Sequence, residues 1–211
     1  KAMDRTHAWA DRSLAAHHKN KNSQQALFGI VQGGRFADLR QESAKAIAAM
    51  DFVGFGIGGS FDKEDLNTAV GWVNSILPEE KPRHLLGIGE PEDLFAGVEN
   101  GVDTFDCVLP TRLARNGNLQ TKHGRLSIEK SEYRNDLSPI ESDCGCYTCA
   151  NYSKAYLAHL FRAEEMLAAT LASIHNLYFS VNLMKNIRQS IFDGRFDEYR
   201  NEFLRDYKQK C

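Results

Sequence analysis

Short apolar segments alternate with helical patterns through the first half of the chain, and this alternation limits the possible folds more than any other feature. Three of the apolar segments cover residues 26–31, 52–57 and 83–88, and the fourth holds Asp106. Helical patterns at 3–18, 38–50, 65–77 and 92–99 precede or separate these segments. Strands that alternate with helices form parallel βαβ units. Continuous apolar strands suit a sheet that is covered on both faces. We therefore predict an α/β fold with four parallel strands, either as part of a (βα)8 barrel or as an open doubly wound sheet.

Glycines and polar residues follow each of the predicted strands. In both architectures, ligands bind at the carboxyl ends of the parallel strands. We therefore expect the residues at these ends to converge in space, namely Gln32, Gly58, Gly59, Gly87 and Asp106. For any single glycine, the alternative is that it only allows the chain to turn.

Asp106 is the strongest candidate for chemistry among these residues. It follows two strand-forming residues, Thr104 and Phe105, and it precedes an apolar run that Pro110 is expected to end. A carboxylate at the tip of a short buried strand needs either hydrogen-bond partners or a chemical role. Arg112 and Arg115 follow at a spacing that suits an anionic ligand. The alternative is a structural aspartate that caps a turn.

Three cysteines stand close together in the second half of the chain, at Cys144, Cys146 and Cys149. Such crowding favours a reducing compartment and a metal site over a disulfide framework. His175 follows in a long helical region and can supply an imidazole as the fourth ligand. Three thiolates and one nitrogen form a closed tetrahedral site, and soft sulfur ligands select zinc. We expect Cys107 to be a small core residue and Cys211 to be a thiol at a frayed end.

The region after Arg115 is polar and has a different pattern. Residues 116–133 predict a small antiparallel excursion, because polarity alternates over residues 124–128. The most basic neighbourhood of the chain lies here and consists of Lys122, His123, Arg125, Lys130 and Arg134. It either contacts RNA or is a solvated surface. The net charge of −2 gives no chain-wide signature of nucleic-acid binding.

Helical patterns dominate the remainder of the chain. Tyr152, Tyr156 and His159 share a helical spacing, which indicates either core packing or a face for a partner. Residues 182–210 predict one or two amphipathic helices that break near Asp193 and Gly194 and present a solvated face of mixed charge. No apolar run is long enough to span a membrane. We expect a cytoplasmic protein.

The run from Phe105 to Arg112, FDCVLPTR, resembles the nucleophile motif of the tRNA-guanine transglycosylases, which exchange a guanine in tRNA for a deazaguanine. The Cys-x-Cys-x-x-Cys spacing and the segments NYSKAYLAHL and ASIHNLYF are similar to the bacterial members of that family. The resemblance extends from Trp9 to about Phe196. It implies a (βα)8 TIM-type barrel with an inserted zinc subdomain. Residues 1–115 would then be the last four βα units, and 116–211 the β excursion, the zinc subdomain and the C-terminal helices of the same structural unit.

The resemblance also implies an activity. Asp106 would attack the ribose of the target guanosine and hold it as a covalent intermediate, which agrees with the chemistry of carboxylate nucleophiles. Guanine at the wobble position of tRNAs with GUN anticodons would be replaced by 7-aminomethyl-7-deazaguanine, a step of queuosine biosynthesis. One structural Zn2+ per chain would be bound by Cys144, Cys146, Cys149 and His175.

Two groups of binding residues follow from the same resemblance. The deazaguanine substrate would contact Gln32, Gly58, Gly59, Ser60, Leu86 and Gly87, although Ser60 stands where leucine is common in the family. The tRNA would contact two segments, which comprise Gly87, Ile88, Gly89, Glu90, Pro91, Glu92, Asp93, Thr111, Arg112, Leu113, Ala114 and Arg115.

Members of that family carry an N-terminal half with the first four barrel strands and two further aspartates, one as a general base and one that anchors the incoming base. The chain starts at Lys1, after the position of that half, so we expect it to be a piece of a longer protein and inactive alone. The resemblance also implies a homodimer formed through the zinc subdomain. The alternative function is a non-catalytic, zinc-stabilised module for RNA binding or dimerisation, and a third possibility is an α/β zinc protein unrelated to RNA.

Overall fold

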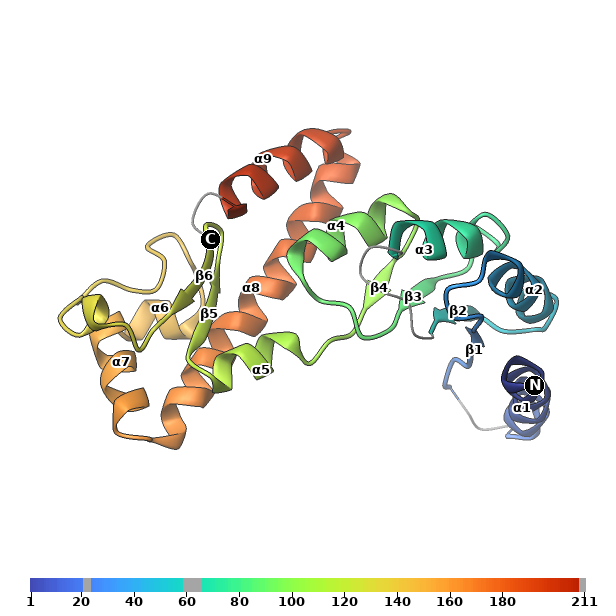
Figure 1. Cartoon of the computed structure of the whole chain (residues 1–211), viewed down its shortest axis with the longest axis horizontal. Helices are drawn as coiled ribbons and strands as arrows, with labels where there is room; N and C mark the ends of the chain where they lie inside the picture. The colour runs from blue at the N-terminus through green and yellow to red at the C-terminus, as the bar shows by residue number, and fades with distance from the viewer. Residues whose placement is uncertain (21–23, 59–65, 209–211) are drawn as a thin grey trace. The chain divides into compact units, whose positions relative to one another are not determined.

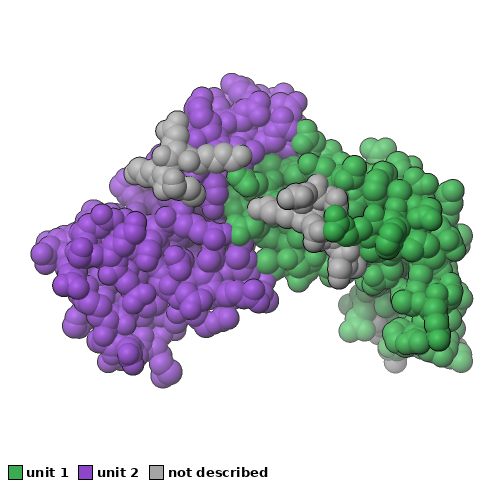
Figure 2. Space-filling view, in the orientation of Figure 1, with its two compact units in different colours: residues 1–107 green, residues 108–211 purple. Residues whose placement is uncertain are grey.

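The structure is a computed structural model that describes residues 1–20, 24–58 and 66–208. The chain divides into two compact units, Lys1–Cys107 and Val108–Cys211, which Figure 2 shows in green and purple. The domain border that we placed after Arg115 stays a prediction, because a compact unit defined by contacts is not by itself a domain.

The first unit contains one sheet of four parallel strands in the order β1-β2-β3-β4 (Figure 1). The strands are β1 (Phe28–Val31), β2 (Gly54–Ile57), β3 (Arg83–Leu85) and β4 (Thr104–Phe105). The predicted α/β fold with four parallel strands is therefore confirmed. Each new strand joins the same side of the sheet, as in a (βα)8 barrel, whereas a doubly wound sheet reverses its direction. The strand order thus favours the barrel alternative.

Four helices precede or connect these strands: α1 (Ala2–Lys19), α2 (Ala37–Ala48), α3 (Leu66–Asn74) and α4 (Pro91–Glu99). β2 is buried at every residue, and its Phe55 packs in one core with Ile47 of α2 and Val73 of α3. Gly29 of β1 permits this close packing, since a Cβ atom there would lie 2.5 Å from Ile47 Cγ2. Burial of these apolar side chains stabilises the sheet by about 25 cal/mol for each Å² removed from water.

The second unit begins with α5 (Leu109–Arg115) and a hairpin of β5 (Asn118–Thr121) and β6 (Gly124–Ser127). A 3-10 turn η2 (Ser131–Tyr133) follows, and then come the helices α6 (Tyr147–Asn151), α7 (Lys154–Arg162), α8 (Met166–Phe192) and α9 (Phe196–Lys208). The predicted antiparallel excursion is confirmed. The predicted helix break is confirmed as well, and Gly194 has a φ of +68° there, a conformation that glycine adopts readily.

Two expectations about the strand that precedes Asp106 are wrong. β4 has only two residues, which are exposed and half-buried, so Asp106 does not follow a buried strand. Pro110 does not end an apolar strand but stands in the first turn of α5. Proline is tolerated there because the first helical N–H groups have no partner within the helix. The predicted strand at 83–88 is also too long, because Gly87 has a φ of +76°, which is not extended backbone.

Among the described residues, no helix is both long enough and apolar enough to cross a membrane.

Candidate active site and metal centre

Asp106 lies directly after β4, and one of its carboxylate oxygens has two partners. Oδ1 accepts a hydrogen bond from the Gly87 N–H at 3.2 Å and lies 3.1 Å from His84 Nε2. The side chain is 61% exposed, so the carboxylate is held on one side and open to solvent on the other. A structural cap of α5 does not account for it, because α5 has no side-chain cap. The arrangement suits a carboxylate that meets a ligand.

His84 is a part of this site that sequence analysis missed. It stands on β3, where it is paired in register with Thr104 of β4, two residues before Asp106. Because side chains alternate along a strand, Thr104 and Asp106 project toward the same face of the sheet, and His84, the partner of Thr104, projects toward that face as well. The His84 ring is held from both sides, since Nδ1 lies 2.8 Å from Thr104 Oγ1 and Nε2 faces Asp106. The strand register is the signal that could have identified it.

Gln32, Gly58 and Leu86 converge at the ends of β1, β2 and β3. A Cβ atom built on Gly58 would lie 3.4 Å from Gln32 Nε2 and 3.3 Å from Leu86 Cδ1. The absence of a side chain at Gly58 therefore leaves room for the Gln32 amide. Gly59 and Ser60 lie outside the described residues. The carboxyl ends of β1, β2 and β3 thus come together around the Gln32 amide and the Leu86 side chain.

Arg40 of α2 supports this edge of the sheet, and sequence analysis did not identify it either. The side chain is fully buried. Its Nε donates to Gly34 O at 2.8 Å and its Nη1 donates to Gly58 O at 2.5 Å, so it joins the segments after β1 and β2. Burial lowers the pKa of this guanidinium below its usual value. A buried arginine is costly unless its donors are used, and here they fix two of the predicted ligand-binding segments.

The two segments predicted to contact RNA differ in how much surface they offer. In the first, which runs from Gly87 to Asp93, Gly87 is exposed, whereas Pro91 and Asp93 are buried at the start of α4. In the second, Arg112 and Arg115 are exposed and stand one turn apart on α5, while Ala114 is buried in the core of its unit. Pro91, Asp93 and Ala114 are therefore poorly placed for direct contact, and the arginines are well placed.

Cys144, Cys146, Cys149 and His175 lie together in the second unit, with all four potential ligand atoms within 4.8 Å of one another. His175 Nδ1 lies 3.8, 3.5 and 3.4 Å from the three sulfur atoms in that order. Typical zinc–sulfur and zinc–nitrogen bonds at tetrahedral angles separate the two ligand atoms by about 3.6 Å. The cluster is therefore compatible with a zinc site.

In the absence of a metal, hydrogen bonds and burial shift the pKa values of the three thiols in different directions. A hydrogen bond with the Cys149 thiol lowers the pKa of Cys146 to about 3, and the same bond raises the pKa of Cys149. Burial raises the pKa of Cys144 to about 11. The protein groups alone thus stabilise a single thiolate. A divalent cation is what can hold three thiolates at this spacing.

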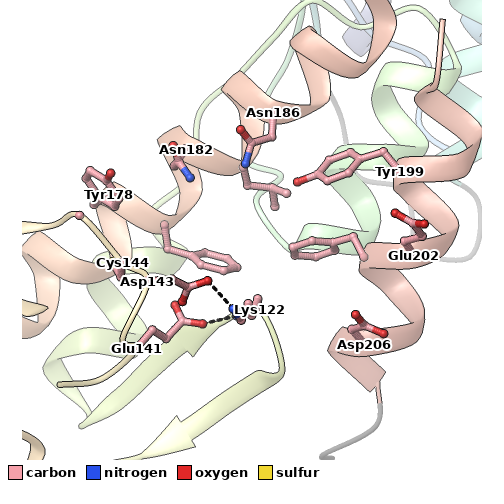
Figure 3. Close-up of a pocket in the computed structure, with 14 residues that line it drawn as sticks. Lys122, Glu141, Asp143, Cys144, Tyr178, Asn182, Asn186, Tyr199, Glu202 and Asp206 are labelled. Atoms are coloured by element: carbon pink, nitrogen blue, oxygen red, sulfur yellow. Dashed lines mark hydrogen bonds and ion pairs between the residues drawn. The ribbon is translucent and has the colours of Figure 1, made fainter. Parts of the chain in front are cut away.

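Groups outside the cluster orient its ligands. His175 Nε2 donates to Gln120 O at 2.8 Å, which leaves Nδ1 as the atom directed at the sulfurs. Lys122, at the β5–β6 turn, anchors the segment that leads into the cysteines. Its N–H donates to Glu141 Oε1 at 2.9 Å and its ammonium pairs with Asp143, as Figure 3 shows at the rim of a pocket between α8 and α9.

Comparisons with known proteins were consistent with one another. A family model described as "Queuine tRNA-ribosyltransferase" matches residues 1–209. Two relatives with the same printed name, from Streptococcus pyogenes serotypes M6 and M5, are each 50% identical over 210 residues. The matched region is 98% of this chain and 55% of each relative. The chain therefore spans about half the length of these relatives.

Replacement of Arg40 by methionine tests its role at the strand ends. Arg40→Met keeps a long side chain but removes the donors to Gly34 O and Gly58 O. The buried carbonyl of Gly58 and the part-buried carbonyl of Gly34 then lose a partner, and the loss at a buried group costs about 1–3 kcal/mol. We expect the free energy of unfolding, measured by urea denaturation, to fall by about 2–5 kcal/mol. Arg12→Met, the same change at an exposed position of α1, is the control. Equal stability of the two variants would contradict the role of Arg40.

Proposed function

Because the chain belongs to the queuine tRNA-ribosyltransferase family, we propose that it supplies the nucleophile, most of the base-binding strand ends and the zinc subdomain of a tRNA base-exchange enzyme. The observation that carries this proposal is the Asp106 carboxylate, held through Oδ1 by Gly87 and His84 and otherwise open to solvent. The substrates would be a tRNA with a GUN anticodon and 7-aminomethyl-7-deazaguanine.

In the proposed reaction, Asp106 acts as the catalytic nucleophile. A carboxylate oxygen forms a bond to the ribose carbon of the wobble guanosine while the bond to guanine breaks, and the guanine leaves with the bonding electrons. The incoming base then displaces the carboxylate from the same carbon. Two displacements retain the configuration of the ribose. Gly87 and His84 hold Oδ1, which reduces the motion of the carboxylate and favours the orientation needed for attack.

The edge of the base would meet Gln32 and Gly58. The Gln32 amide offers both donors and an acceptor, which is the pattern needed to recognise a purine-like edge. Leu86 is 40% exposed beside it and offers an apolar contact for the ring. Gln32 follows one outer strand of the sheet and Asp106 follows the other. Three strand spacings separate them by about 14 Å in a flat sheet, so curvature of the barrel would bring base and ribose within reach of both.

The tRNA would be held by charge. Arg112 and Arg115 are the exposed cations of α5, and guanidinium groups bind phosphate with two parallel hydrogen bonds. The target base must leave its stack to reach Asp106, as in other enzymes that modify bases. We propose that the arginines fix the phosphate backbone around the extruded nucleotide.

We propose that Zn2+ occupies the cluster of Cys144, Cys146, Cys149 and His175 as a structural ion, one per chain. A site with four protein ligands has no open position for a reacting water. When bound, the ion would supply stability to the second unit and no chemistry to the exchange reaction.

The zinc subdomain also supports a proposed homodimer. Tyr156 and His159 of α7 are exposed, which does not fit core packing at these two positions, whereas Tyr152 is half-buried and packs against the core. The Tyr152 and Tyr156 rings stack with their centroids 5.4 Å apart. Because Tyr152 packs against the core of the second unit, the exposed Tyr156 ring extends this packing to the surface, where an aromatic side chain suits a protein partner. The same surface favours the alternative function, a non-catalytic zinc-stabilised module for RNA binding or dimerisation, and we propose the cytoplasm as the location in either case.

Metal analysis tests the proposed ion. We expect about one zinc per chain, and its loss in Cys146→Ser, because that change removes a buried sulfur ligand. A strong chelator should lower the thermal midpoint of the chain and leave Cys146→Ser unchanged. Cys107→Ser, outside the cluster, is the control. A folded wild-type chain without metal, or retention of zinc in Cys146→Ser, would contradict the assignment.

Exchange of labelled guanine into a tRNA with a GUN anticodon tests the function. The assay would compare the chain alone with a chimera in which it replaces the matching part of the Streptococcus pyogenes serotype M6 relative. We expect activity only in the chimera, because base-binding aspartates are expected in the half that the chain does not span. Asp106→Asn should reduce the rate about a thousandfold or more, whereas Asp11→Asn, at an exposed position of α1, should not. tRNA binding without exchange by the chimera would favour the non-catalytic module.

A further inference from the structure

Asn176 joins three segments of the second unit through one buried side chain. It is fully buried on α8, directly after His175. Its Oδ1 accepts from the Gln120 N–H at 2.9 Å, and its Nδ2 donates to Asn118 O at 2.9 Å and to Pro110 O at 3.0 Å. The amide thus connects α8 with β5 and with the first turn of α5. Both N–H donors of the side chain and one lone pair are used.

His175 and Asn176 together hold a single residue of β5. His175 Nε2 donates to Gln120 O, while Asn176 Oδ1 accepts from Gln120 N. The residue that faces the three sulfurs and the residue that contacts α5 are therefore consecutive on one helix. A ligand that holds His175 in place would therefore also hold α8 in register with β5. The position of the Asn176 amide would be fixed as a consequence.

Helix α5 depends on such contacts for its position. It covers only Leu109–Arg115, and helices of this length are marginal in water without tertiary packing. Its buried face is anchored by Ala114 in the core and by the bond from Asn176 to Pro110 O. Its other face carries the exposed Arg112 and Arg115.

We propose that Asn176 is a positioning residue that couples the metal cluster to α5 and thereby sets where Arg112 and Arg115 meet the phosphate backbone of the RNA. The inference rests on the proposed function and extends it, because it assigns the cluster an effect on RNA affinity in addition to stability. Asparagine is required by the hydrogen-bond pattern. An aspartate would keep the acceptor for Gln120 N but would place a carboxylate against two carbonyl oxygens.

The test uses the chimera made inactive by Asp106→Asn, and the measured quantity is its dissociation constant for a tRNA with a GUN anticodon. Asn176→Asp should weaken binding about tenfold and reduce its salt dependence, because phosphate contacts by the arginines are lost. Asn182→Asp, the same change at an exposed position of α8, should have no effect. Zinc content and circular dichroism confirm that each variant is folded.

A double-mutant cycle separates positioning from general destabilisation. In a background with Arg112→Gln and Arg115→Gln, Asn176→Asp should cause no further loss of tRNA affinity, because the groups it positions are absent. Additive losses would overturn the inference. If the two arginine changes leave tRNA affinity intact, the inference also fails, and so does the proposed role of α5 in RNA binding. If the arginine changes weaken binding and Asn176→Asp does not, only the inference fails.

Hydrogen exchange keeps the inference testable should Asn176→Asp not fold. The chimera that carries only Asp106→Asn is used for this test. Removal of its metal should accelerate hydrogen exchange at α5 amides that are hydrogen-bonded within the helix, such as Ala114. The same removal should weaken its affinity for tRNA. The same removal should leave tRNA affinity unchanged in the variant that lacks both arginines. Exchange in α5 that does not respond to the metal would overturn the coupling.

Discussion

The parallel pairing of β3 with β4 is the constraint on which the candidate active site depends. It places His84 beside Thr104. It also brings His84 Nε2 and the Gly87 N–H to the carboxylate of Asp106, two residues after Thr104. The same pairing continues through β2 to β1, where Gly58, Gln32 and Leu86 meet. Because all four strands run in one direction, their carboxyl ends lie at one edge of the sheet, and the residues that directly follow the strands are placed there together. Arg40 strengthens this alignment from within the core.

A second constraint, independent of the sheet, organises the other unit. Four ligand atoms from the cysteine loop and α8 meet within 4.8 Å, a spacing at which three thiolates repel one another without a cation. Around this point, His175 and Asn176 hold β5, and Asn176 holds the start of α5. In the role proposed for Asn176, a metal bound at this cluster would influence RNA affinity through α8 and α5 without itself contacting the RNA. Under the proposed function, the first unit would contribute the nucleophile and the base contacts, and the second would contribute contacts to the RNA backbone and the surface for assembly.

Much of this arrangement could be predicted from the sequence, for reasons that particular residues make clear. Strand–helix alternation gave four parallel strands, and the spacing of Cys144, Cys146 and Cys149 indicated a metal cluster, because both signals are local in the chain. The local context of Asp106 was misjudged, since Pro110 can either end a strand or begin a helix and only tertiary packing decides between them. His84, Arg40 and Asn176 were not identified. Each acts through partners twenty or more residues away or through backbone atoms, and neither kind of contact leaves a pattern in the sequence.

The measurement that tests the central claim most directly is the location of the covalent intermediate. The active chimera would be incubated with a GUN-anticodon tRNA without an incoming base, quenched in denaturant, and digested with protease and ribonuclease. Mass spectrometry of the peptides would then locate the attached ribonucleotide. We expect an ester on Asp106, in the peptide that contains FDCVLPTR. An ester on any other carboxylate, or a covalent complex of equal yield in Asp106→Asn, would contradict the assignment of Asp106 as the nucleophile.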